Sequence, residues 1–183
     1  MKKRSSKELL AEALLSLSET MPIDKITVKQ LVMESGVSLQ TFYNHFSDKS
    51  DLILWIHKSV YEDLFNRMNN GELTRKQLLT EYVRYYMEHK EFMVNAFHST
   101  LGQDPFARNI ANHTYDLYLD FLTKKYQTKS LPQDIQFMLR LYCHAETLAI
   151  EKYAELFPHL PQKMAVDYIY ESMPKKLEEF IEG

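Results

Sequence analysis

The sequence predicts an all-α fold, and three observations support this prediction. Apolar residues recur at helical spacing along most of the chain, most clearly at Leu9, Leu10, Ala13, Leu14 and Leu17. The apolar-polar alternation that is typical of strands is hardly seen. The 183 residues include only four Gly and six Pro, and no run rich in these residues separates two parts of the chain. We therefore expect helices that pack directly against one another.

The first two helices are defined by their ends. A helix is predicted over residues 6–20, because the residue before the proline of Met21-Pro22 avoids helical dihedral angles. Thr27 stands three residues before Gln30, which is the spacing of a capping box. A short second helix should therefore begin directly after Thr27.

A tight turn and a third helix should follow. Gly36 can adopt the left-handed conformation that ends a helix, and Ser38 can cap the next one. Ser47 or Asp48 then begins a long helix that runs to about Met68, before an Asn-Asn-Gly turn signal. The order helix, tight turn, helix is thus predicted within the first fifty residues.

The remaining helices are predicted from the same kinds of signal. Thr74 and Gln77 form another capping box, opening a helical stretch that reaches about residue 100 with a bend near Lys90. Asp104 should cap the following helix, with Pro105 as its first residue.

Two long helices should end the chain, at about 133–156 and 162–181, separated by the segment 158–161 with a proline at each end. Eight or nine helices are expected in all.

Charge alone does not suggest a nucleic-acid partner. The net charge of the chain is -3, with seven Lys and Arg against six Asp and Glu in residues 1–50. The N-terminal part therefore has a net charge of +1 and the remainder -4, which is only a mild asymmetry. An argument for DNA binding has to come from a motif.

Targeting signals favour a cytoplasmic protein. Acidic residues at Glu8, Glu12 and Glu19 interrupt the stretch that would have to be the apolar part of a signal peptide after the basic residues 2–4. No run of about eighteen apolar residues could form a membrane span. Cys143 is the single cysteine, so an internal disulfide is excluded, in agreement with a reducing compartment.

The segment 26–49 has the features of a helix-turn-helix. The apolar residues Val28, Leu31, Val37, Phe42 and Phe46 can fill a small core that fixes one helix against the next. The polar residues between them are then turned outward.

This segment resembles the DNA-binding signature of the TetR family of transcriptional regulators. The resemblance lies in Gly36-Val37 at the turn, Thr41-Phe42-Tyr43 in the recognition helix, His45-Phe46, and Lys49 at the start of the next helix. It implies an all-α protein in which an N-terminal three-helix DNA-binding domain packs on a larger helical domain for ligand binding and dimerisation. We place these domains at residues 1–50 and 51–183.

Candidate DNA contacts fall into two groups. The second helix of a helix-turn-helix enters the major groove, so the candidates for base edges are Ser38, Leu39, Gln40, Thr41 and Asn44. The amides of Gln40 and Asn44 suit adenine, and Thr41 can meet a thymine methyl. The resemblance implies phosphate contacts from Thr27, Tyr43, His45 and Lys49. Leu39-Gln40 departs from the Lys-Gly pair that many relatives have, so the family's base preference does not carry over.

The remainder of the chain resembles the shorter C-terminal domain of regulators from low-GC Gram-positive bacteria, including regulators of the dihydroxyacetone kinase operon type. A homodimer is implied, with its interface on the last two helices. The apolar candidates for this interface are Phe137, Leu141, Leu148, Tyr153, Val166, Ile169, Met173, Leu177 and Phe180. Periodicity does not separate interface residues from intrasubunit core.

The middle helices are rich in aromatic residues, which suits either a small-molecule pocket or an ordinary core. The candidate effector contacts are Tyr82, Tyr86, His89, Met93, Phe97, Tyr115, Tyr142 and His144. The seven histidines include no pair at a usual metal-binding spacing, and no catalytic or phosphate-binding motif is present. We therefore expect no metal, no cofactor and no enzymatic activity.

The sequence thus favours a ligand-responsive repressor that binds double-stranded operator DNA as a homodimer. The first alternative is a DNA-binding activator or co-regulator that a protein partner controls. The second is a helical enzyme or scaffold that does not bind DNA.

Overall fold

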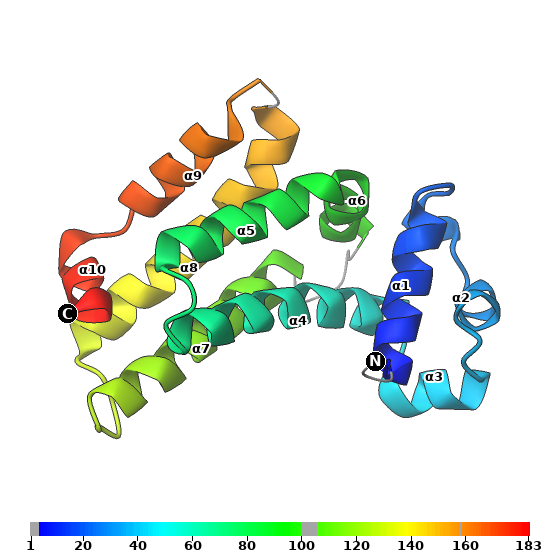
Figure 1. Ribbon diagram of the computed structural model, residues 1–183, viewed down its shortest axis with the longest axis horizontal. Coiled ribbons are helices and arrows are strands. Elements are labelled where there is room, and N and C mark those ends of the chain that lie inside the picture. Colours follow the sequence, from blue (N-terminus) through cyan, green and yellow to red (C-terminus); the bar gives the residue numbers. More distant parts are fainter. Residues whose placement is uncertain (1–3, 100–105, 158) are drawn as a thin grey trace. The chain divides into compact units, whose positions relative to one another are not determined.

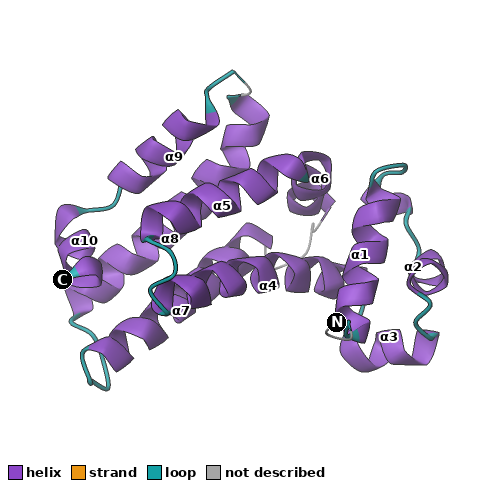
Figure 2. Ribbon diagram, in the orientation of Figure 1, coloured by secondary structure: helices purple, strands orange, loops and turns teal. Residues whose placement is uncertain are grey.

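The computed structural model describes residues 4–99, 106–157 and 159–183, without the side chains of 97–99 and 154. This part of the chain contains ten α-helices, one short 3-10 helix and no strand (Figures 1 and 2). The all-α prediction is confirmed, although it gave only eight or nine helices. No helix in the described ranges is long and apolar enough to cross a membrane.

The chain divides into two compact units. The first consists of residues 1–57 and 89–106, and the second of residues 58–88 and 107–183. The predicted domain boundary at residue 50 stays a prediction, and the segment 89–106 was not expected in the first unit. The helix α4 (Lys49–Asn69) belongs to both units because the division falls within it.

In the first unit, the helices are α1 (Ser6–Ser18), the 3-10 helix η1 (Ile23–Lys25), α2 (Val28–Ser35), α3 (Leu39–His45), the start of α4, and α6 (Lys90–Ser99). The short helices α2 and α3 both pack against α1 (Figure 1). This packing is what a three-helix domain with a helix-turn-helix requires.

In the second unit, the rest of α4 is followed by α5 (Arg75–Glu88), α7 (Phe106–Lys125), α8 (Gln133–Leu156), α9 (Gln162–Glu171) and α10 (Lys175–Glu182). The helix α9 lies beside α5, and α10 contacts α8 (Figure 1).

Local signals placed several helix ends correctly. The Thr27 hydroxyl accepts a hydrogen bond from the Gln30 amide nitrogen at 3.2 Å, and the Gln30 side chain accepts one from the Thr27 backbone at 2.9 Å. Thr74 and Gln77 make the same reciprocal pair at 3.2 and 2.8 Å. Gly36 ends α2 with a φ of 67°, the left-handed conformation that glycine adopts at little steric cost. These capping predictions are confirmed.

The predicted helix over 162–181 is wrong. The structure has α9 and α10 in its place, with a break between Ser172 and Pro174. Proline has no backbone N–H and its ring clashes with the preceding turn, so Pro174 stands before the first residue of α10 instead of inside a helix. The bend expected near Lys90 is a break between α5 and α6 at His89. Asp104 and Pro105 lie outside the described residues.

Candidate nucleic-acid interface

A small apolar core holds the helix-turn-helix together. Leu31 and Phe42 are completely buried, and Phe46 is almost so. The rings of Phe42 and Phe46 lie 5.9 Å apart, and Phe46 meets Trp55 of α4 edge-on at 5.9 Å. Val28 and Val37, which were expected in this core, are only half-buried. The buried face of α3 therefore fixes which of its side chains point to solvent.

The outward face of α3 carries the five candidates for base contacts. Four of them are exposed, and Thr41 is half-buried. The Ser38 and Thr41 hydroxyls are 2.8 Å apart, and the Gln40 amide donates to the Asn44 side-chain oxygen at 3.0 Å. The Gln40–Asn44 pair restricts the rotamers of both amides before any DNA arrives. Less side-chain entropy would then be lost on binding.

The candidates for phosphate contact border this face. Thr27, Tyr43 and His45 are exposed. The Tyr43 ring packs edge-on against Phe42 at 5.3 Å, so the core fixes its direction. The nine proposed DNA contacts stay predictions.

Lys49 has a structural role that the sequence did not reveal. Its ammonium group donates to the carbonyl oxygens of Ile23, of Ile26 at 2.7 Å and of Asp24 at 3.4 Å. Partial burial lowers the pKa of Lys49, against the raising effect of Asp24. Lys49 therefore ties the start of α4 to η1, and a phosphate would have to share its ammonium group with these carbonyls.

Two further residues of the first unit were missed. Met33 on α2 is 74% exposed and adds an apolar side chain to the surface of the helix-turn-helix. Lys7 of α1 places its ammonium group 5.6 Å from the Phe46 ring centre and 5.7 Å from that of Trp55, a cation-π arrangement. Of these two features, only the exposure of Met33 could have been predicted from the sequence, because Met33 lies outside the apolar stripe of α2.

The eight candidate effector residues divide between the two units. His89, Met93 and Phe97 belong to the first unit, and the side chain of Phe97 is not described. The other five belong to the second unit, where Tyr82, Tyr86, Tyr115 and Tyr142 are buried and His144 is half-buried. The aromatic residues of the second unit thus contribute to its core.

A buried polar network crosses that core. Glu146 of α8 accepts a hydrogen bond from the Tyr61 hydroxyl at 3.2 Å and is also hydrogen-bonded by Tyr142. Burial raises the pKa of Glu146, although these hydrogen bonds and the positive charge of Arg75 oppose the rise. Arg75 donates to the Tyr142 hydroxyl at 3.3 Å. Glu146 follows Tyr142 by four residues on one face of α8, which was the only sequence signal of the network.

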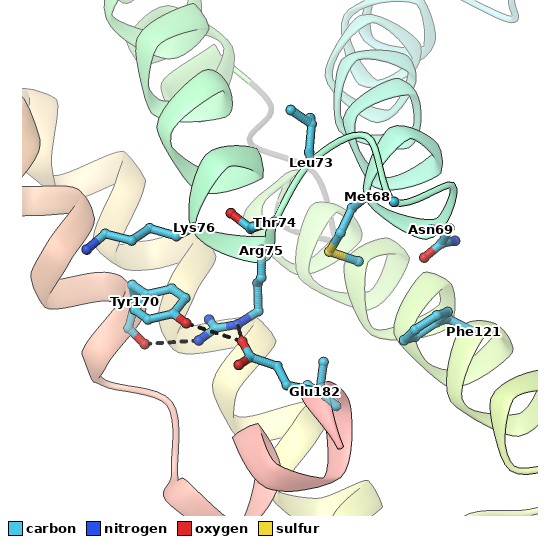
Figure 3. Close-up of a pocket in the computed structure, with 11 residues that line it drawn as sticks. Met68, Asn69, Leu73, Thr74, Arg75, Lys76, Phe121, Tyr170 and Glu182 are labelled. Carbon is cyan, nitrogen blue, oxygen red and sulfur yellow. Dashed lines mark hydrogen bonds and ion pairs between the residues drawn. The ribbon is translucent and has the colours of Figure 1, made fainter.

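Arg75 also borders a cavity of about 590 Å³ in the second unit (Figure 3). Arg75, Tyr170 and Glu182 gather at one side, and Met68 and Phe121 lie at the other (Figure 3). None of the seven candidate effector residues whose side chains are described lines this cavity.

Comparison with known proteins identifies the family. Residues 74–165, about half of the chain, match a TetR family model described as the transcriptional regulator C-terminal region. The matched region runs from the start of α5 into α9, which is the part of the chain that had no sequence motif.

Two curated relatives match over part of their length. The chain is 30% identical over 93 residues to the nucleoid occlusion factor SlmA of Alteromonas mediterranea, covering 48% of each protein. It is 25% identical over 92 residues to the dhaKLM operon transcriptional activator DhaS of Lactococcus lactis, covering 50% of this chain and 49% of DhaS. The chain thus spans about half the length of these curated relatives.

Solved structures show the same fold over nearly the whole chain. The dihydroxyacetone kinase operon activator DhaS superposes with a TM-score of 0.62 at 15% identity, covering 96% of this chain and 97% of that one. The repressor FadR of Thermus thermophilus, solved with lauroyl-CoA, superposes with a TM-score of 0.60 at 18% identity, covering 90% and 91%. Together with the family model, these likenesses lead to one conclusion: the chain belongs to the TetR family of DNA-binding transcriptional regulators.

Proposed function

We propose that the chain is a ligand-responsive repressor that binds a palindromic operator as a homodimer in the cytoplasm and has no catalytic role. The observation that carries the proposal is the α3 surface. Its polar side chains Gln40, Thr41 and Asn44 stand on a helix that the buried Phe42 fixes in place. Such a helix fits the major groove, where amide and hydroxyl groups read base edges.

The dimer face is proposed on α8. Phe137, Leu141 and Leu148 are 70%, 59% and 49% exposed, and their spacing places them along one side of the helix. The helix α9 adds Met164 and Tyr168, which are also exposed. Large apolar side chains clustered on a surface are typical of an interface, and a second copy of the chain covers them in our proposal.

The other residues suggested for that interface have a different place. Tyr153, Val166, Ile169, Met173 and Leu177 are buried within the chain, and Phe180 is half-buried. They are therefore intrasubunit core. These side chains point inward and pack α8, α9 and α10 together. Phe137, Leu141 and Leu148 remain exposed and form the proposed contact with the partner.

Ligand response is proposed for the second unit. The FadR structure contains lauroyl-CoA, so one protein of this fold binds a small molecule. In our proposal, a ligand in the second unit changes the distance between the two helix-turn-helix domains of the dimer. Effector and operator binding would then be reciprocally coupled, by about 1–3 kcal/mol as is typical of allosteric proteins.

An activator is the second candidate, because the relative DhaS is named as a transcriptional activator. Transcription in vitro from the promoter upstream of the chain's own gene separates the two candidates. A repressor lowers the transcript yield when it is added with RNA polymerase, and a matching effector restores the yield. A rise in yield on adding the protein would instead establish the activator.

Replacing Gln40 by Ala should relax base preference. The substitution removes the amide proposed to read a base and leaves Asn44 without its hydrogen-bonded neighbour. A lost direct contact costs about 1–3 kcal/mol on the preferred base and little on others. The measurement is binding to operator variants, with the exposed Gln133 of α8 replaced by Ala as a control. An equal loss on every variant sequence would refute the proposed role of Gln40.

Replacing Tyr43 by Phe should weaken binding to all sequences alike. Only the hydroxyl is lost, while the edge-on packing of the ring against Phe42 remains. A hydrogen bond to a charged phosphate contributes about 1.5–3 kcal/mol, so a loss of roughly tenfold or more is expected. The salt dependence should not change, because no charge is removed. Tyr126→Phe, directly after α7, is the control outside the interface, where the lost hydroxyl donates to the Phe180 carbonyl oxygen. A loss confined to the operator would contradict phosphate contact.

A further inference from the structure

The Arg75 guanidinium is held by an aromatic ring and two oxygen acceptors in addition to its carboxylate partners. It stacks on the Tyr170 ring at 3.9 Å, and it donates to the Tyr170 carbonyl oxygen at 3.4 Å and to the Tyr142 hydroxyl at 3.3 Å. The Arg75 side chain is only 3% exposed. A buried cation needs an anionic partner, because removal from water disfavours its charge. The contacts with Tyr170 and Tyr142 therefore fix the orientation of the Arg75 guanidinium before an anion binds to it.

Besides the buried Glu146 of α8, on which its charge acts, Arg75 meets two carboxylates of α10. Glu178 and Glu182 of α10 approach the guanidinium at 3.5 and 3.3 Å. Arg75 Nε donates to Glu182 at 3.3 Å, which is longer than the distance of about 2.7–2.9 Å in the closest arginine–carboxylate bonds. Glu182 also accepts a hydrogen bond from the Tyr170 hydroxyl at 3.2 Å, and its side chain is 45% exposed. Because its side chain is partly exposed, the Glu182 carboxylate can turn toward solvent when another anion takes its place on Arg75.

The neighbouring cation is already paired. Lys76 binds Asp167 of α9 at 2.7 Å and extends away from the cavity (Figure 3). Across the cavity from Arg75 lie the apolar side chains of Met68 and Phe121 (Figure 3), and Leu73 and Ile181 also line the walls. A volume of about 590 Å³ falls within the range of roughly 300–1,000 Å³ that is usual for small-molecule sites.

We propose that this cavity binds a small monocarboxylate with an apolar body, whose carboxylate takes the place of Glu182 on Arg75. A single negative charge fits, because Glu178 remains beside the same guanidinium. The apolar body fills the space between Arg75 and Phe121.

The site also suggests how a ligand would act on the dimer. Arg75 reaches Tyr142 of α8, and α8 carries the proposed dimer face. This effector role rests on the proposed regulatory function, whereas carboxylate binding itself does not.

Calorimetric titration of the full chain with octanoate, and with octan-1-ol as the neutral probe, tests the site. Octanoate should bind at least about tenfold more tightly than octan-1-ol, since only octanoate pairs with Arg75. Glu182→Gln removes the competing charge and should tighten octanoate binding roughly fivefold, without changing octan-1-ol binding. Glu179→Gln is the matched control, because Glu179 is on the same helix and pairs with Lys175.

Arg75→Gln should abolish the preference for octanoate, with circular dichroism checking that the variant is folded. If it does not fold, the Glu182→Gln titration decides. Equal binding of the two probes, or octanoate binding that Glu182→Gln leaves unchanged, overturns the proposal.

Operator binding is measured separately by fluorescence anisotropy. Octanoate should lower the affinity for the operator. In the Glu182→Gln variant, the same decrease should occur at a lower octanoate concentration. Operator affinity that octanoate does not change overturns the effector role. A chain that binds octanoate but no operator refutes the regulator and leaves the site established.

Discussion

Replacing Leu141 by Asp should convert the proposed dimer to a monomer of 21.7 kDa and reduce operator affinity by at least about 100-fold. Leu141 is 59% exposed on the proposed dimer face of α8. In a two-fold interface the substitution brings two carboxylates into an apolar contact, where neither has a cationic partner. A monomer has only one helix-turn-helix domain, so it loses the operator affinity that is gained when two such domains are linked.

Light scattering coupled to size exclusion gives the mass, and anisotropy gives the operator affinity. Leu141→Met is the matched control, because it conserves volume and apolar character and should remain dimeric. Circular dichroism should show both variants folded, since an exposed position of the protomer is changed. A Leu141→Asp protein that stays dimeric would place the interface elsewhere.

His57 should make the stability of the first unit fall as the pH is lowered below 6.5. Its imidazole is completely buried, and burial lowers its pKa from 6.5 to about 3. The Phe106 ring meets it edge-on at 4.7 Å, and the Phe92 ring is stacked at 6.0 Å. Between pH 6.5 and 3 the unfolded chain binds a proton at this residue and the folded chain does not. Stability is therefore fully present above pH 6.5 and decreases by about 1.4 kcal/mol per pH unit below it.

Urea denaturation between pH 7.5 and 4.5 measures this dependence. His57→Leu replaces the imidazole by an apolar side chain of similar size and should flatten the decrease, most visibly below pH 6. His45→Leu, which changes an exposed histidine, is the matched control. A profile of His57→Leu that falls as steeply as that of the wild type would show that other groups cause the acid sensitivity.

Local signals predicted most of the fold. The capping boxes at Thr27 and Thr74 and the left-handed Gly36 involve residues within a few positions of one another, so the local sequence predicts their geometry. The break at Pro174 is equally local and was overlooked because the apolar stripe continues across it. The helix-turn-helix, its exposed face and the family could thus be predicted from residues 26–49.

Features that depend on distant residues could not be predicted. The carbonyls that Lys49 contacts lie more than twenty residues earlier in the chain. The pairing of Arg75 with Glu182 joins residues that are 107 positions apart. Periodicity placed Leu141 and Ile169 alike on apolar stripes, and only packing shows that the first is exposed and the second buried.

The most direct test of the central claim is a fluorescence-anisotropy titration of the chain against the DNA upstream of its own gene. It is performed at two salt concentrations beside a scrambled duplex of equal length. We predict binding that is at least about 1,000-fold tighter to the upstream DNA and that weakens steeply with salt on both duplexes. Equal affinity for the two duplexes at both salt concentrations would contradict sequence-specific recognition of that DNA by the α3 surface.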